Sequence, residues 1–186
     1  MKRIAAITVV LVVLLSGVGA SASSSLHHQL LTPKEVPGWA KYYIAKAQTQ
    51  SCPESTFDKP SNASAIREVF ANRSSETLLL EKLVISSDPS LAYTKLLDHM
   101  TKCTKTAATF DGQVTFQRKQ PVNLGRYSVP VKGYTIAFVL GGANVTGVIA
   151  YAKKGRVVLA LAEITLTELS ARQFKATLRV ALSRIS

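Results

Sequence analysis

Reactive side chains are scarce in this 186-residue sequence, which has two cysteines and three histidines. His27 and His28 lie in a polar stretch near the N-terminus, whereas His99 precedes Cys103 by one helical turn. The His99 and Cys103 pair could in principle coordinate a metal or act as base and nucleophile. However, a metal would need further ligands, and a cysteine in a disulfide is not a nucleophile. We therefore expect no metal site, no cofactor and no catalytic residue.

Motifs for nucleophilic catalysis and phosphate binding are also missing. The Gly-x-Ser-x-Gly motif does not occur, and Gly141-Gly142 lies between two predicted strands rather than before a helix, as is typical of a turn. Glu163 and Glu168 are the only acids after Asp111. Glu163 ends an apolar stretch, where a carboxyl group either has a raised pKa or, as we expect, pairs with a nearby Lys or Arg. The chain is predicted not to be an enzyme.

Long hydrophobic runs are absent as well. The longest, Ile4 to Leu15, is too short to span a bilayer, which takes about 20 apolar residues. Two basic residues precede it and the small-residue triplet Ala20-Ser21-Ala22 follows it, which together predict a secretory signal peptide over residues 1–22. We expect a flexible leader over 23–29 and one domain over 30–186. Because no cysteine lies near the cleavage site, the product is predicted to be soluble and extracytoplasmic, without a lipid anchor.

The two cysteines, Cys52 and Cys103, are expected to pair with each other, since exported proteins meet oxidising conditions. The bridge would close a loop of about 50 residues and stabilise the fold by roughly 4 kcal/mol. The alternative is two buried free thiols.

Acidic residues become rare in the second half of the chain. Between Gly112 and Ser186 there are eleven Lys or Arg and two Glu. Such an excess attracts an anionic lipid surface or a wall polymer, and we expect no nucleic-acid partner. The alternative is a basic surface without a specific partner. The candidate residues are Arg118, Lys119, Arg126, Lys132, Lys153, Lys154 and Arg156.

Secondary-structure signals in the first half predict both strands and a helix. Thr32-Pro33 predicts a one-turn helix, and 39–49 a strand. Residues 64–72 and 76–86 predict a β-hairpin. Asp88-Pro89 predicts the start of a helix that ends near Cys103.

In the second half, three strands separated by short turns are predicted over 134–140, 145–152 and 156–164, which favours an antiparallel meander. Ser170 to Gln173 forms a capping box ahead of an amphipathic helix. The expected fold class is α+β, an antiparallel sheet of about five to seven strands with helices packed on it and one disulfide.

The order of these features resembles the PknH-like extracellular sensor domain family, which occurs in actinobacterial receptor kinases and in free-standing secreted or lipid-anchored relatives. The resemblance rests on Leu30-Leu31-Thr32, Val36-Pro37-Gly38-Trp39, Cys52, the helix ending at Cys103, and Asn123-Leu124-Gly125. It implies a cleft with apolar walls between sheet and helices that binds a small extracytoplasmic ligand. This sequence departs from the kinase-linked members, which carry two disulfides.

Aromatic residues with polar groups could line such a cleft, although most should belong to the core. The candidates are Trp39, Tyr42, Tyr43, Tyr127 and Tyr134. A pocket of about 300 Å³ or more is expected if a ligand binds there. The predicted function is that of a secreted, non-enzymatic binding protein for a small apolar, amphipathic or anionic molecule of the cell envelope. The alternative is a module that docks on another envelope protein through a sheet edge or an apolar patch.

Overall fold

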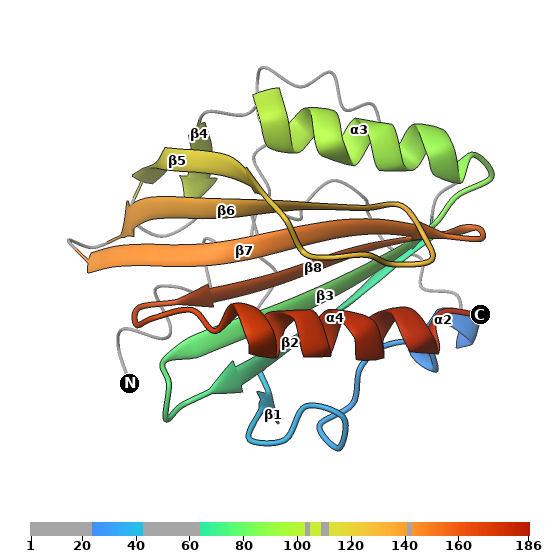
Figure 1. The fold of residues 1–186 in the computed structure, drawn as a ribbon, viewed down its shortest axis with the longest axis horizontal. Coiled ribbons are helices and arrows are strands. Elements are labelled where there is room, and N and C mark those ends of the chain that lie inside the picture. The colour runs from blue at the N-terminus through green and yellow to red at the C-terminus, as the bar shows by residue number, and fades with distance from the viewer. Residues whose placement is uncertain (1–23, 43–63, 103–104, 109–111, 141–142) are drawn as a thin grey trace.

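A computed structural model describes residues 24–42, 64–102, 105–108, 112–140 and 143–186. It contains one antiparallel sheet in the order β1-β2-β3-β8-β7-β6-β5-β4, with helices α3 and α4 packed on it (Figure 1). The strands are β1 (Ala40–Lys41), β2 (Ser64–Asn72), β3 (Thr77–Ile85), β4 (Lys105–Ala108), β5 (Gly112–Val122), β6 (Val131–Leu140), β7 (Ala143–Lys154) and β8 (Val157–Thr165). The helices are α2 (Ser24–His27), α3 (Pro89–Lys102) and α4 (Ala171–Arg184).

The predicted α+β class is confirmed. Six strands have nine or more residues, within the expected range, and the short strands β1 and β4 extend the sheet at its two edges. The hairpin β2-β3 and the meander β6-β7-β8 form as predicted. Pairing of β3 with β8, from Thr77↔Thr165 to Ile85↔Val157, joins the hairpin to the meander. This long-range pairing has no local sequence signal.

Side chains alternate between the two faces of the sheet and build two cores. On one face, α3 contributes Ala92, Leu96 and Met100 to a cluster with β8 residues such as Ala160. On the other, α4 contributes residues such as Phe174 to a second cluster. All nine residues of β8 are buried, because this strand lies in the middle of the sheet and is covered on both faces. Its nearly continuous apolar sequence follows from that position.

Both long helices begin where the sequence predicted. Leu91 N donates a hydrogen bond to Asp88 Oδ1 at 2.9 Å ahead of α3. Ser170 caps α4 by accepting a hydrogen bond from Gln173 N at 3.2 Å. These side-chain acceptors satisfy backbone N–H groups that the first turn of a helix leaves without partners.

The N-terminal segment differs from expectation. Instead of forming a free leader, residues 24–27 form the short helix α2, and Leu26 is completely buried in the α4-side core. Thr32-Pro33 starts a turn rather than a helix. Thr32 N and Oγ1 both donate to Glu35 Oε2 at 2.8 Å, and Glu35 N donates to Thr32 O, before Pro37 ends the pattern.

Some predictions fall on parts of the chain that the structure does not describe. Of the strand expected over 39–49, Ala40 and Lys41 form β1, and residues beyond Tyr42 lie outside the described ranges. The predicted signal peptide and the bridge between Cys52 and Cys103 also lie outside them, so both stay predictions.

Candidate functional site

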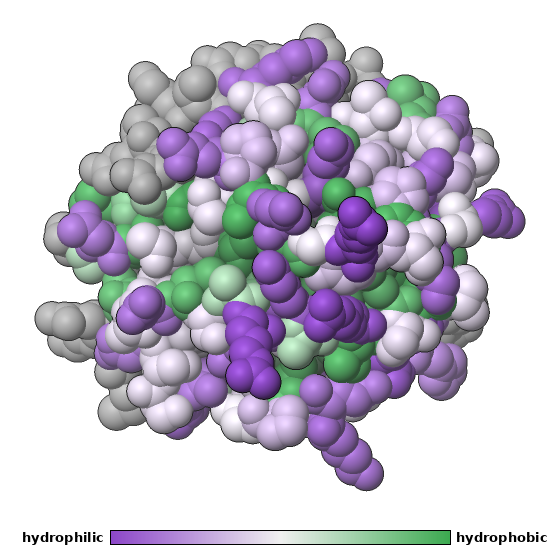
Figure 2. Space-filling view, in the orientation of Figure 1, coloured by the Kyte–Doolittle hydropathy of each residue, from purple (hydrophilic) through white to green (hydrophobic). Residues whose placement is uncertain are grey.

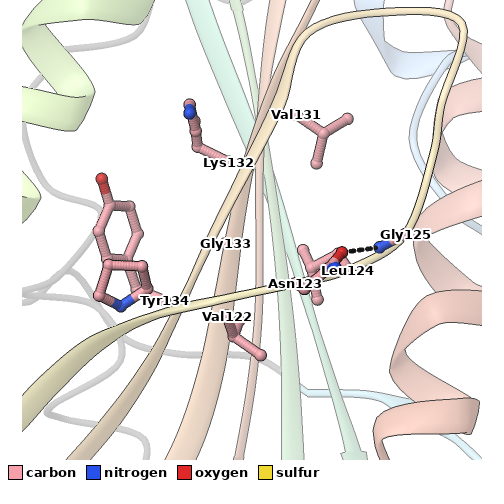
Figure 3. A pocket seen from close by; sticks show the side chains of 9 residues that line it. Val122, Asn123, Leu124, Gly125, Val131, Lys132, Gly133 and Tyr134 are labelled. Carbon is pink, nitrogen blue, oxygen red and sulfur yellow. Dashed lines mark hydrogen bonds between the residues drawn. The ribbon is translucent and has the colours of Figure 1, made fainter.

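A pocket of about 390 Å³ lies at the corner of the sheet where β5 ends and the chain returns as β6 (Figure 3). It is larger than the roughly 300 Å³ typical of small ligand sites. Its lining comes from β5, β6 and the segment joining them, and not from the space between the sheet and the helices. The lining residues are Pro121, Val122, Asn123, Leu124, Gly125, Val131, Lys132, Gly133 and Tyr134.

Local backbone geometry shapes this corner. Asn123 Oδ1 accepts a hydrogen bond from Gly125 N at 2.8 Å, and Gly125 has φ +98°, a conformation that side chains disfavour. Leu124 is buried against Gly133, where an added Cβ would lie 2.5 Å from Leu124 Cδ1. The absence of a side chain at Gly133 therefore allows Leu124 to form the wall of the pocket.

The pocket has an apolar side and a polar side. Lys132 and Tyr134 point to one side of β6, whereas Val131 and Leu124 lie on the other (Figure 3). Lys132 is exposed, and its ammonium group forms no ion pair within the described part of the chain. The lining thus offers a cation and a phenol for an anionic group on one side of the strand, and aliphatic walls for an apolar chain on the other.

Three phenol groups extend the polar side toward α3. Tyr134 on β6 lies near both Tyr93 of α3 and Tyr151 of β7. Burial raises the pKa of Tyr93 and of Tyr151, and the proximity of Tyr134 raises each further. The Tyr93 hydroxyl is buried and has no hydrogen-bond partner among the described residues. Such an unpaired buried group is costly, and Tyr93 itself does not line the pocket.

Of the five aromatic residues proposed as ligand contacts, Tyr134 alone lines the pocket. Trp39 is buried in the α4-side core, and Tyr42 packs against the opposite cluster. Tyr127 supports the pocket wall from outside, because its hydroxyl donates to Leu124 O at 3.3 Å. Tyr43 lies outside the described residues. Thus most of these aromatics serve packing.

Two of the seven candidate cations are engaged at the ends of helices. Lys119 Nζ donates to Met100 O at 2.8 Å at the end of α3. Lys154 Nζ donates to Leu182 O at 3.1 Å and to Ile185 O at the end of α4. These ammonium groups satisfy helix C-terminal carbonyls.

The other candidate cations are spread over the molecule. Lys153 Nζ donates to Ser90 Oγ at 2.9 Å beside α3, although the next residue, Lys154, reaches the opposite face of the sheet. Arg126 is exposed in the segment joining β5 to β6, and Arg156 is exposed in the turn between β7 and β8. The side chain of Arg118 is not described. Lys132 is the member of this set that lines the pocket. The sequence alone did not predict that role, because it depends on the pairing of β5 with β6, which brings the end of β5 beside Lys132.

Three ionisable groups are buried in the middle of the sheet. Burial raises the pKa of Glu163 to about 7, and no described residue pairs with its Oε2 atom, so the expected ion pair is wrong there. Burial also raises the pKa of Glu81 to about 8, although Glu81 Oε2 accepts a hydrogen bond from Leu31 N at 2.6 Å. Burial, together with Arg67, lowers the pKa of Lys82 to about 8. None of the three lines the pocket.

The described ranges hold no group of three or more His, Cys, Asp or Glu that could coordinate a metal. His27 and His28 are exposed, and His99 lies on α3. No helix in these ranges is long and apolar enough to cross a bilayer.

An antiparallel sheet with a helix on each face and a pocket at one corner defines the class as an α+β domain. The fold is similar to that of the extracellular domain of PknH from Mycobacterium tuberculosis, with a TM-score of 0.57 over 89% of this chain and 97% of that chain. The two are 11% identical, so the likeness shows a distant relationship of fold alone. No family model and no curated protein matches the chain.

Proposed function

We propose that this chain is a secreted, non-enzymatic binding domain that holds a small amphipathic molecule with an anionic group in the corner pocket. The observation that carries this proposal is the pairing of aliphatic walls with Lys132, a cation that has no described counter-ion, in a pocket of about 390 Å³. The fold shared with an extracellular domain and the predicted signal peptide support an extracytoplasmic location.

In this arrangement each part of the pocket has a separate role. The ammonium group of Lys132 and the hydroxyl of Tyr134 bind a carboxylate or phosphate group, and Val122, Leu124 and Val131 contact the apolar part. A charge-assisted hydrogen bond contributes about 1.5–3 kcal/mol, whereas the short apolar chain adds affinity in proportion to its buried area.

Docking on another protein through a sheet edge is the weaker alternative. Along β5, beyond the part paired with β4, Pro121 has no N–H to donate and a bulge lies between Phe116 and Arg118. Both features blunt an edge against strand addition. The exposed apolar residues Leu91 on α3 and Val139 on β6 lie on opposite faces of the sheet and do not form one patch.

Isothermal titration of the mature chain with decanoate and decyl phosphate tests the proposal. We expect binding of both probes, and a loss of affinity of about tenfold or more in Lys132→Gln. Lys102→Gln, which removes an exposed cation of α3, serves as the matched control and should bind like the wild type. If neither probe binds, and native mass spectrometry of gently purified protein detects no small molecule, the proposal is wrong.

A further inference from the structure

The outward face of α4 carries a basic stripe. It consists of Arg172, Lys175 and Arg179, which are spaced three and four residues apart and therefore lie on one side of the helix. The opposite side packs into the core through residues such as Phe174 and Leu178. In Figure 2, hydrophilic side chains lie over α4 among less polar ones.

The charge of this stripe is not neutralised locally. There is no acidic residue from Ala171 to the C-terminus, and none of the ion pairs formed by the described residues includes a member of the stripe. The fourth cation of α4, Arg184, is engaged separately, because its Nη1 atom lies 2.6 Å from Glu35 Oε1. The stripe is thus a surface of one sign.

Small residues lie between the cations. Ala176 and Ser183 occupy the same outward side of the helix and are exposed. A helix that inserts into the acyl region presents large apolar residues, whereas this one presents none on its outward side. The chemistry therefore fits adsorption to an anionic surface rather than insertion.

The stripe lies close to the wall of the corner pocket. Burial raises the pKa of Tyr127, and the nearby charge of Arg179 opposes that rise. The hydroxyl of Tyr127 in turn donates to Leu124 O, and Leu124 lines the pocket. A lipid bilayer presents anionic headgroups, which match the stripe, and contains amphipathic molecules, which match the pocket.

We propose that the stripe of Arg172, Lys175 and Arg179 binds the headgroup layer of an anionic lipid bilayer. The choice of a bilayer over a soluble polyanion rests on the proposed function of the pocket; the anionic character of the partner rests on the stripe alone. Each cation near such a surface contributes about fivefold to the partition constant, so three together contribute on the order of 100-fold.

Co-sedimentation of the mature chain with vesicles tests this proposal, using phosphatidylcholine alone and phosphatidylcholine mixed with phosphatidylglycerol. We expect binding to the anionic vesicles, weakening with added salt, and a loss of about 100-fold in Arg172→Gln/Lys175→Gln/Arg179→Gln. The matched control is Arg67→Gln/Lys95→Gln/Lys102→Gln, which removes the same charge from the α3 side of the molecule and should retain binding.

Three outcomes would overturn the proposal. They are no binding of the wild type to anionic vesicles, an equal loss in both triple variants, and binding to soluble polyphosphate in place of vesicles. Titration of the stripe variant with decyl phosphate separates this proposal from the function of the pocket. If the stripe variant binds decyl phosphate normally but no longer binds vesicles, the result supports the proposed lipid surface. If the wild type does not bind decyl phosphate but still binds vesicles, the result contradicts the proposed function of the pocket and leaves the stripe proposal standing.

Discussion

Replacement of Glu163 by glutamine should change how stability depends on pH. Glu163 is 3% exposed, no described residue pairs with its Oε2 atom, and burial raises its pKa from 4.5 to about 7. The folded state therefore holds a proton at this carboxyl that the unfolded state releases between these two pH values. The contribution of the protonated Glu163 to the free energy of unfolding is fully present below pH 4.5 and is lost as the pH rises through about 7.

The size of the effect follows from the shift. A difference of about 2.5 pH units corresponds to roughly 3 kcal/mol of unfolding free energy. Because Glu163→Gln keeps a neutral side chain of similar shape, the variant should unfold within about 1 kcal/mol of the wild type at pH 5 and should be more stable by roughly 2–3 kcal/mol at pH 8.5. Glu81, whose pKa is also raised, is present in both proteins and cancels in the difference.

Urea denaturation followed by circular dichroism at pH 5, 7 and 8.5 measures this difference. The exposed acid Glu168 supplies the control, because Glu168→Gln should give a difference that is flat across the series. A difference between Glu163→Gln and wild type that does not grow with pH would refute the reasoning, since it would mean that Glu163 is solvated or paired in the folded protein.

Three further predictions concern packing and caps. Gly133→Ala should lower the free energy of unfolding by about 1–3 kcal/mol in thermal melting, because the new methyl group displaces Leu124. The same displacement should weaken the binding of decyl phosphate. An unchanged melting temperature would contradict the close contact. Lys154→Met should lower the free energy of unfolding by about 1–2 kcal/mol in urea denaturation, because it removes the hydrogen bonds to the C-terminal carbonyls of α4. Lys154→Arg should restore part of this loss. Equal stability of the two variants would contradict the capping role. Leu26→Ala should lower the free energy of unfolding by about 2–5 kcal/mol in the same assay, because Leu26 is completely buried. His27→Ala, which changes an exposed neighbour, should have little effect. Unchanged stability of Leu26→Ala would mean that this segment does not pack on the core.

Local patterns in the sequence predicted the long elements because each carries its own signal. The cap at Asp88, the capping box at Ser170 and the short turn at Lys154-Gly155 act between residues close in the chain. The N-terminal segment was predicted less well. Its polar composition suggests a free leader. However, Leu26 is buried by residues of α4 and the sheet. These residues are distant in the sequence, so a local sequence pattern gives no sign of them.

The candidate site was predicted in its chemistry but not in its place. The sequence contained the tyrosines and the basic residues, and it could not tell which of them are used for packing or capping. Lys119 and Lys154 bind helix ends, and Tyr127 supports a wall, because tertiary contacts bring those carbonyl groups within reach. Lys132 keeps an exposed ammonium group because the described chain brings no acid to it.

By itself, then, the sequence determined the fold class, the main helices and the hairpin and meander, since propensity, caps and turns operate over a few residues. Only the tertiary structure decided the pairing of β3 with β8, the burial of Glu81 and Glu163, and the corner pocket around Leu124 and Gly133. Those features depend on contacts between segments far apart in the chain or across the two faces of the sheet. Such contacts are selected by the packing of the whole molecule rather than by any stretch of it.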